Sequence, residues 1–284
     1  NMHKLHCVVG PTATGKTKKA IELSKLSPSI LVSADSRQVY RGMDIVTGKD
    51  HPKDLVLYGI DIVEPEEECS VSVWYNSVTP HIQRAWEEAK QVIVVGGTGL
   101  YVKALTDGIA TLSVPINQSL RDELSLLSTS KLQMKLKSLD LAKFASMNNS
   151  DVNNPRRLIR AIEVAISPKP TRESSLSKLE SNLIGLKYYD DSNHRSIVKS
   201  RVIDRLNDGA IEETKTLLSK YDPNLKSMTA IGYKSIISYL KGDLSYAQLI
   251  ENWVRDEMAY VKRQMTWFNK VKSIKWYDSY IQED

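Results

Sequence analysis

The chain has 284 residues, of which 41% are hydrophobic, and it carries a formal net charge of +5. This length is sufficient for one large core, or for one core with a small appended module. No apolar run approaches the roughly 18 residues that cross a bilayer, and the start lacks the pattern of a secretory signal, so we expect a cytoplasmic protein without a membrane partner.

The first hundred residues alternate short apolar runs with amphipathic stretches. Strands are predicted at 5–9, 30–32, 60–63 and 92–95, and helices at 17–26 and 73–90. Continuous apolar strands separated by helices are typical of a parallel sheet that is covered on both faces. Cys7 and Cys69 have neither metal-ligand spacing nor a near partner in sequence, and we expect both to be free thiols.

The pattern of predicted secondary structure changes at residue 114. Helices without strands are predicted at 120–127, 131–139 and 155–166, followed by an exposed loop at 167–177. Residues 113–181 hold 11 Lys/Arg against 7 Asp/Glu, so most of the positive excess lies in this segment. The remaining predicted elements are a strand at 182–186, helices at 196–218, 234–240 and 246–269, and a last strand at 273–277.

These elements predict an α/β fold with two parts. Residues 2–113 and 182–284 would form a core like that of P-loop NTPases, with a parallel sheet between two layers of helices. Residues 114–181 would form an all-helical, basic insertion domain.

A phosphate-binding loop joins the first predicted strand to the first helix. Residues 10–17, with the sequence GPTATGKT, match G-x-x-x-x-G-K-[ST] at every fixed position. Backbone N–H groups and the helix N-terminus favour phosphate there, Lys16 adds a full charge, and Thr17 can ligate Mg²⁺. The loop predicts a polyphosphate ligand but not a reaction, because ATP hydrolases and kinases also use it.

Asp35 follows the second predicted strand, at the sheet edge where open α/β folds bind their ligands. Its carboxylate is expected to be a Mg²⁺ ligand or a general base, and the alternative is a turn former or helix cap. The polar, basic stretch at 37–49 lacks periodicity and is interpreted as a functional loop.

Further motifs make the sequence resemble the tRNA dimethylallyltransferase (tRNA isopentenyltransferase) family over nearly its whole length, in the bacterial form that lacks a zinc-finger extension. Besides the phosphate-binding loop, the matching segments are SADS at 33–36, QVY at 38–40, GMDI at 42–45, TGK at 47–49, GGTGLY at 96–101, NPRR at 154–157, RAIEV at 160–164, AIGYK at 230–234 and KRQMTWF at 262–268.

The resemblance implies dimethylallyl diphosphate as donor, Mg²⁺ as cofactor, and an adenine N6 in the tRNA anticodon stem-loop as acceptor. It implies that Asp35 is the base, assisted by Lys16 and Thr17, with Mg²⁺ on Thr17 and a contribution from Asp35. A monomer is our default expectation. The donor diphosphate would be bound by Gly10, Thr12, Ala13, Thr14, Gly15, Lys16, Thr17, Thr98 and Arg201. The tRNA would be bound by Ser36, Gln38, Tyr40, Lys49, Gly97, Arg157, Arg160, Lys234, Lys262 and Arg263.

Several of these residues have a second interpretation from the sequence alone. The glycine turn at 96–99 would allow close approach of a ligand or simply form a tight turn. The arginines at 156–160 would contact phosphates or pair with Glu163 on a solvated face. We expect Trp267 and Phe268 to be core anchors and the neighbouring charges to face substrate.

The sequence departs from the family pattern at two places. Ile197 occupies the position of a usual arginine, and Glu257-Met258 replaces a usual Thr-Arg pair. Arg195 and Arg255 are candidates to replace the missing charges, whereas the phosphate-binding loop and Asp35 are intact.

Three other functions remain possible from the sequence. An adenylate isopentenyltransferase would share the donor loop and Asp35, but a mononucleotide acceptor needs no basic helical insertion. A small-molecule P-loop kinase would transfer phosphate from ATP. A non-catalytic RNA-binding protein would not need Lys16, Thr17 and Asp35 intact.

Overall fold

The computed structural model describes residues 3–50, 52, 54–109, 111–112, 114–167 and 179–282. The chain divides into two compact units, one formed by Asn1–Asp107 with Lys178–Asp284 and the other by Gly108–Ser177. Within the described ranges, no helix combines the length and apolar character that crossing a membrane requires. The exposed loop predicted at 167–177 lies, after Ser167, outside the described residues.

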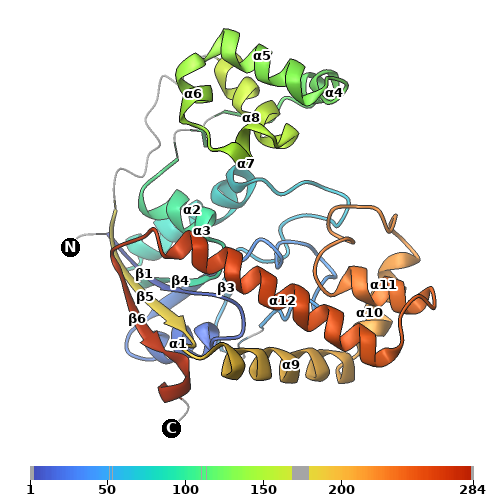
Figure 1. The fold of residues 1–284 in the computed structure, drawn as a ribbon. Coiled ribbons are helices and arrows are strands. Elements are labelled where there is room, and N and C mark those ends of the chain that lie inside the picture. Colours follow the sequence, from blue (N-terminus) through green and yellow to red (C-terminus); the bar gives the residue numbers. More distant parts are fainter. Residues whose placement is uncertain are drawn as a thin grey trace. The chain divides into compact units, whose positions relative to one another are not determined.

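The larger unit contains a six-stranded sheet in the order β3-β2-β4-β1-β5-β6 (Figure 1). Every neighbouring pair is parallel, which confirms the predicted fold class. The strand that follows the helical unit, β5, returns to the sheet between β1 and the edge strand β6. The strands are β1 (Lys4–Val9), β2 (Ser29–Ser33), β3 (Leu57–Tyr58), β4 (Gln91–Gly96), β5 (Glu180–Lys187) and β6 (Ile274–Asp278).

Helices cover both faces of this sheet (Figure 1). Successive side chains of a strand point to opposite faces, so apolar strands supply two cores. Ala20 of α1 (Lys16–Ser24) packs with Val8 and Ile93 on one face. On the other face lie α2 (Val71–Glu87) and α3 (Gly99–Thr106). The fully buried Trp74 of α2 donates its indole N–H to the Ser33 carbonyl, 2.9 Å away.

The C-terminal helices form a further core beside the sheet. Trp253 and Tyr233 are completely buried there among aliphatic side chains. The longest helix, α12, begins with a capping box between Ser245 and Gln248 and runs across the unit in Figure 1. The elements are α9 (Asp191–Asn207), α10 (Ala210–Leu218), α11 (Tyr233–Leu240), α12 (Tyr246–Phe268) and the 3₁₀ turn η1 (Ser279–Gln282).

The smaller unit is entirely helical in its described residues. Leu124, Leu132, Leu136 and Leu158 form the centre of its core. Pro155 occupies the first turn of α8, where its missing N–H costs nothing, and the Asn154 side chain caps that helix. The helices are α4 (Gln118–Ser125), α5 (Thr129–Leu139), α6 (Leu141–Ser146), α7 (Asn149–Val152) and α8 (Pro155–Ile166).

Two predicted elements are wrong in detail. The third strand lies at Leu57–Tyr58 rather than 60–63, because Asp61 has a left-handed φ of 52° that interrupts the extended backbone. The helix predicted at 196–218 is two helices, α9 and α10, since Gly209 with φ 105° turns the chain between them. The short helices α3, α6 and α7 were not predicted. Both cysteines are free, as expected.

Candidate active site

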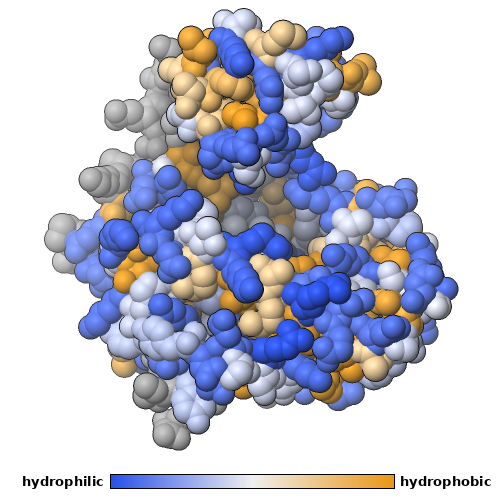
Figure 2. Space-filling model, in the orientation of Figure 1, coloured by the Kyte–Doolittle hydropathy of each residue, from blue (hydrophilic) through white to orange (hydrophobic). Residues whose placement is uncertain are grey.

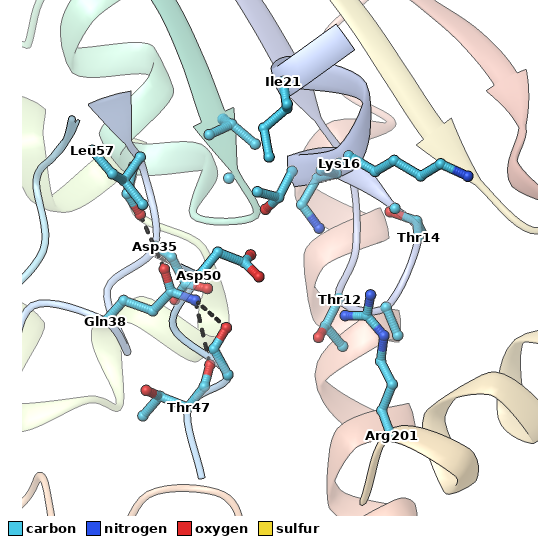
Figure 3. Close-up of a pocket in the computed structure, with 18 of the residues that line it drawn as sticks. Thr12, Thr14, Lys16, Ile21, Asp35, Gln38, Thr47, Asp50, Leu57 and Arg201 are labelled. Atoms are coloured by element: carbon cyan, nitrogen blue, oxygen red, sulfur yellow. Dashed lines mark hydrogen bonds between the residues drawn. The ribbon is translucent and has the colours of Figure 1, made fainter. Parts of the chain in front are cut away.

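A cavity of about 440 Å³ lies at the carboxyl edge of the sheet in the larger unit (Figure 3). The phosphate-binding loop forms one part of its wall, and the loops after β2 and residues of α9 form others. Figure 3 shows Lys16, Asp35 and Arg201 around this space. The lining includes Thr12, Ala13, Thr14, Gly15, Lys16, Thr17, Asp35, Arg37, Gln38, Thr47, Gly48, Asp50, Arg201 and Arg205.

Lys16 is held inside the phosphate-binding loop. Its ammonium donates to the Pro11 carbonyl at 2.6 Å, and the Thr14 hydroxyl donates to the same carbonyl at 2.9 Å. Burial lowers the pKa of Lys16 to about 7, although the nearby Asp35 carboxylate raises it. A polyanion in the cavity would favour the charged form of this lysine.

Asp35 occupies the predicted position beyond the carboxyl end of β2. The backbone there is tied to the neighbouring strand, since Ala34 N–H donates to the Val95 carbonyl at 2.8 Å. The Asp35 carboxylate accepts the Arg37 N–H at 2.8 Å, which fixes its orientation in an Asx turn. Its side chain lines the same cavity as Lys16. The structure therefore brings the loop and this carboxylate together.

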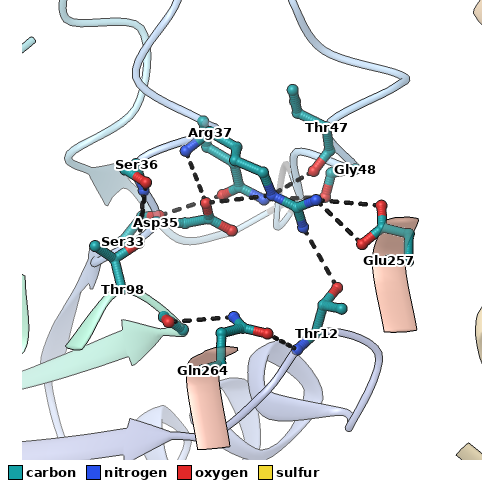
Figure 4. Close-up of polar contacts among 12 residues, drawn as sticks. Thr12, Ser33, Asp35, Ser36, Arg37, Thr47, Gly48, Thr98, Glu257 and Gln264 are labelled. Carbon is teal, nitrogen blue, oxygen red and sulfur yellow. Dashed lines mark hydrogen bonds and ion pairs between the residues drawn. The ribbon is translucent and has the colours of Figure 1, made fainter. Parts of the chain in front are cut away.

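A buried ion pair lies beside Asp35 (Figure 4). The Nη1 of the Arg37 guanidinium donates to both oxygens of Glu257, each at 3.1 Å, and the Arg37 Nε lies 3.9 Å from Asp35. The guanidinium also stacks on the Tyr260 ring, 4.7 Å from its centre. Burial opposes the charge of Arg37, but the Glu257 and Asp35 carboxylates raise its pKa. Arg37 thus remains a fixed cation next to Asp35.

Three side chains fix Thr12 in the phosphate-binding loop. Gln264 of α12 accepts the Thr12 N–H at 3.0 Å, and His194 of α9 lies 2.8 Å from the Thr12 carbonyl. Arg37 donates to the Thr12 hydroxyl at 3.4 Å. Burial lowers the pKa of His194. Because a carbonyl oxygen can only accept, the His194 Nε2–H is the donor of this hydrogen bond. The loop is consequently held in shape from outside.

Thr98 and Gly97 connect the glycine turn to its surroundings. The Thr98 hydroxyl accepts the Ser36 N–H at 2.9 Å, which ties the turn to the Asp35 loop. Gly97 accepts an N–H from the Gln264 amide at 3.1 Å, and a Cβ at Gly97 would lie 2.2 Å from that amide nitrogen. The room that the glycine leaves is filled by Gln264. The turn packs tightly at Gly97, and its neighbour Gly96 lines the larger cavity, so a role of the turn in ligand binding stays a prediction.

A second cavity, of about 160 Å³, adjoins the Asp35 loop. It shares Arg37 and Thr47 with the larger cavity and is lined by Ser36 and Tyr40 on that loop. The other wall comes from the segment that leads into α11. Its lining there consists of Lys226, Ser227, Ala230, Ile231 and Tyr233.

The residues predicted to bind tRNA in the larger unit fall into two groups. The Lys49 side chain is fully buried and pairs with Asp44 at 2.7 Å, and Gln38 donates to the Thr47 and Gly48 carbonyls at 3.3 Å, so both side chains make their contacts inside the loop. Lys262 and Arg263 are exposed on α12. Lys234 is half-exposed and pairs with Asp256 at 3.2 Å. Hydrophilic side chains dominate the visible face of α12 in Figure 2.

The two predicted arginines of the helical unit also differ. Arg157 is exposed and pairs with Asp151. Arg160 pairs with the buried Glu163 at 2.5 Å and donates to the Thr111 and Val114 carbonyls at 2.9 and 3.0 Å. Glu163 also forms an ion pair with Arg121, with 2.9 Å between the Arg121 Nη2 and the Glu163 Oε2. Arg160 is thus engaged within its own unit.

The comparisons with known proteins agree over nearly the whole chain. A family model described as IPP transferase matches residues 38–271, and one described as Isopentenyl transferase matches residues 3–59. A tRNA dimethylallyltransferase from Clostridioides difficile is 36% identical over 98% of this chain and 93% of the relative. This chain belongs to the tRNA dimethylallyltransferase family.

Solved structures of this family have the same fold. A tRNA isopentenylpyrophosphate transferase from Bacillus halodurans superposes with a TM-score of 0.70 at 33% identity, covering 98% of this chain and 90% of that one. A eukaryotic dimethylallyltransferase acting on tRNA gives a TM-score of 0.80 at 24% identity, covering 97% and 74% of the two chains, and supports the fold.

The structure also explains how this dimethylallyltransferase-family chain accommodates its departures from the family pattern. Glu257 is buried against Arg37, whereas Arg195 pairs on the surface with Glu251 at 3.2 Å and Arg255 is exposed near Asp256. Neither candidate replacement lines the larger cavity. The residues that sequence reasoning did not single out are Arg37, His194, Arg205, Tyr260 and Gln264. Two of them lie in segments identified from the sequence, Arg37 in the functional loop at 37–49 and Gln264 in KRQMTWF.

Proposed function

We propose that this enzyme transfers a dimethylallyl group from dimethylallyl diphosphate to N6 of an adenine in the tRNA anticodon loop, on the 3′ side of the anticodon, and releases diphosphate. The observation that carries the proposal is that the phosphate-binding loop and Asp35 line one cavity. A phosphate cradle and a carboxylate are the two groups that this reaction requires, one for the leaving group and one for the proton of the nucleophile.

The phosphate-binding loop stabilises the leaving group. When the allylic C–O bond breaks, negative charge grows on the diphosphate. The loop amides, Lys16 and Arg201 line the cavity and would stabilise that charge. The unliganded Lys16 has a pKa of about 7, so the approach of a diphosphate drives it to its charged form. Because the hydrogen bonds to Thr12 fix the loop beforehand, little reorganisation is needed during reaction.

Asp35 acts as the base. The N6 nitrogen forms a bond to the allylic carbon as the diphosphate leaves, and a proton passes from N6 to the Asp35 carboxylate. The Arg37 N–H holds one carboxylate oxygen at 2.8 Å, which orients the other toward the cavity contents. An exocyclic amine is a weak nucleophile, so placement beside the electrophile contributes as much as basicity.

The residues present fit a magnesium ion that is shared with the substrate. Mg²⁺ usually takes one or two protein oxygens together with substrate phosphates and water. Thr17 and Asp35 supply such oxygens in the cavity, and within the described parts of the chain no cluster of three or more His, Cys, Asp or Glu forms a separate metal site. Bound there, Mg²⁺ would neutralise diphosphate charge.

The acceptor approaches from the smaller cavity. That cavity meets the larger one at Arg37 and Thr47 and presents Ser36 and Tyr40 beside Asp35. An adenine from a single-stranded loop can be extruded into such a space at low cost. Exposed Lys262, Arg263 and Arg157 are the basic residues assigned to tRNA phosphates, because their side chains reach solvent.

An adenylate isopentenyltransferase is the second candidate, because the model described as Isopentenyl transferase matches residues 3–59. The two functions separate when the protein is given Mg²⁺, labelled dimethylallyl diphosphate and either unmodified tRNA or AMP. We expect label in tRNA, none in AMP, and none with Asp35→Ala. Label in AMP alone would assign the second candidate, and label in neither acceptor would refute both.

A further inference from the structure

Helix α9 carries a second arginine at the donor cavity, one turn beyond Arg201. Arg205 follows Arg201 by four residues, so both side chains lie on one face of the helix, and both line the 440 Å³ cavity with the phosphate-binding loop. Only 14% of the Arg205 side chain is exposed. It is therefore a largely buried cation that lines the candidate polyanion site.

Arg205 is held in place but incompletely neutralised. Its Nη1 donates to the Val46 carbonyl at 3.1 Å and lies 3.5 Å from Glu257. Glu257 already accepts two hydrogen bonds from Arg37 and a third from the Trp253 indole at 3.2 Å. Glu257 thus lies between two guanidiniums, and Arg37 is also shared with Asp35 at 3.9 Å. The cavity lining as a whole holds six Lys/Arg residues against three Asp/Glu residues, so its wall carries an excess of positive charge.

The surrounding backbone leaves room for this guanidinium. A Cβ at Gly48 would lie 2.5 Å from the Arg205 Nη2, so the side chain passes directly over the turn at Thr47 and Gly48. That turn is itself part of the cavity wall. Burial lowers the pKa of Arg205, because a charged guanidinium loses hydration there. A bound anion would offset that desolvation cost.

We propose that Arg205 is a further ligand of the donor's diphosphate and that Glu257 is a positioning residue that holds Arg205 and Arg37. The inference rests on the proposed function, since it assigns the leaving group to this site. A guanidinium bonds phosphate oxygens through a planar fork, so Arg205 and Arg201 would bind one phosphate while the loop and Lys16 bind the other. This division selects a diphosphate over a monophosphate.

The test uses Arg205→Met in the full-length enzyme, with inorganic pyrophosphate and Mg²⁺ as the probe in calorimetry. Loss of one charged contact is expected to weaken pyrophosphate binding by about tenfold or more and to raise the donor KM by a similar factor, with a smaller change in kcat. Lys199→Met is the matched control, because Lys199 is an exposed cation of α9 that pairs with Glu251. It should leave both values unchanged.

The result that would overturn the proposal is pyrophosphate affinity and donor KM equal to those of the wild type in a folded Arg205→Met. If that variant does not fold, Arg205→Lys decides, because it keeps the charge and loses the fork, and a ligand role predicts several-fold weaker binding. Orthophosphate binding should change much less than pyrophosphate binding. If the wild type binds pyrophosphate but transfers no label to tRNA, the proposed function is refuted. The role of Arg205 in binding pyrophosphate would still be supported in that case.

Discussion

The side-chain oxygen of Gln264 accepts the backbone N–H of Thr12 at 3.0 Å, while the nitrogen of the same amide donates to the Gly97 carbonyl at 3.1 Å. One buried amide thereby joins the phosphate-binding loop after β1 to the glycine turn after β4. Neither loop has a partner of its own for these backbone groups in the described contacts. The spacing of the two loops is set by a residue of the last long helix.

Replacing Gln264 by alanine leaves the buried Thr12 N–H and Gly97 carbonyl without partners. Each unsatisfied group costs about 1–3 kcal/mol, so we expect a large loss in the free energy of unfolding together with a raised donor KM. Urea unfolding and steady-state kinetics measure the two effects. Gln83→Ala, on the exposed side of α2, is the control and should change neither. Stability and KM close to those of the wild type in Gln264→Ala would show that the bridge is dispensable.

Asp35→Asn keeps the shape of the side chain and removes its basicity. Because a general base typically contributes about 10²–10⁴-fold, we expect a loss of that size in the single-turnover rate of transfer to tRNA. Donor and tRNA affinity should change little. Asp204→Asn, an exposed carboxylate on α9, serves as the comparison. A rate within a few-fold of the wild type would remove Asp35 from the role of base.

The lowered pKa of Lys16 predicts a pH dependence of donor capture. The charged form binds diphosphate and predominates below its pKa of about 7, so kcat/KM for the donor should fall as the pH rises above that value. The pH profile of kcat reports the enzyme with donor bound. Because the bound diphosphate favours charged Lys16, the decline of kcat should occur at higher pH than the decline of kcat/KM. Initial rates between about pH 6 and 9 measure both profiles.

Lys16→Arg checks the origin of this decline. A guanidinium stays charged throughout the range, so the variant should lose the alkaline decline whatever its absolute rate. The exposed neighbour Lys18 provides the matched Lys18→Arg, which should keep it. A wild-type kcat/KM that stays flat to pH 9 would contradict the assignment.

Glu257→Gln should destabilise the protein strongly. Removing one partner of a buried ion pair leaves uncompensated charge, here on Arg37 and Arg205, at a cost of about 3–5 kcal/mol. Urea unfolding at neutral pH measures it. Glu251→Gln, which breaks only exposed pairs with Arg195 and Lys199, should cause no measurable change. Equal stabilities of the two variants would mean that Glu257 contributes little.

Glu257 should also make the free energy of unfolding depend on pH in the acidic range. Burial tends to raise its pKa, but Arg37 and Arg205 lower it below the ordinary value. A carboxyl group with a lowered folded-state pKa contributes stability above its unfolded pKa of about 4.3 and loses it as the pH falls through the folded value. The difference in unfolding free energy between wild type and Glu257→Gln should therefore shrink as the pH falls below about 4.3. A constant difference would contradict this.

The sequence predicted those parts of the site that depend on residues close to one another along the chain. The loop at 10–17 has a fixed spacing, and Asp35 follows an apolar strand, so their meeting at one sheet edge follows from parallel topology. The fold class followed from the same alternation of apolar strands and helices. The strand predicted at 60–63 failed because a β-branched run gives no sign of the left-handed Asp61.

Residues that act across the fold could not be predicted in this way. Arg37 and Glu257 are 220 positions apart, and nothing local to either distinguishes a buried pair from two solvated charges. Lys49 illustrates the reverse case, since a lysine in a polar loop suggests an RNA contact but is buried between two aspartates. His194 is one imidazole in a polar helix, and its role depends on the Thr12 carbonyl lying opposite.

The 252 positions between Thr12 and Gln264 have a consequence for biosynthesis. The phosphate-binding loop is among the first segments to leave the ribosome, and the amide that braces it is made about 10–50 s later at typical elongation rates. Until α12 has emerged and docked, the loop lacks Gln264 and Arg37 lacks Glu257. A nascent chain would therefore acquire the braced form of the phosphate-binding loop only near the end of translation.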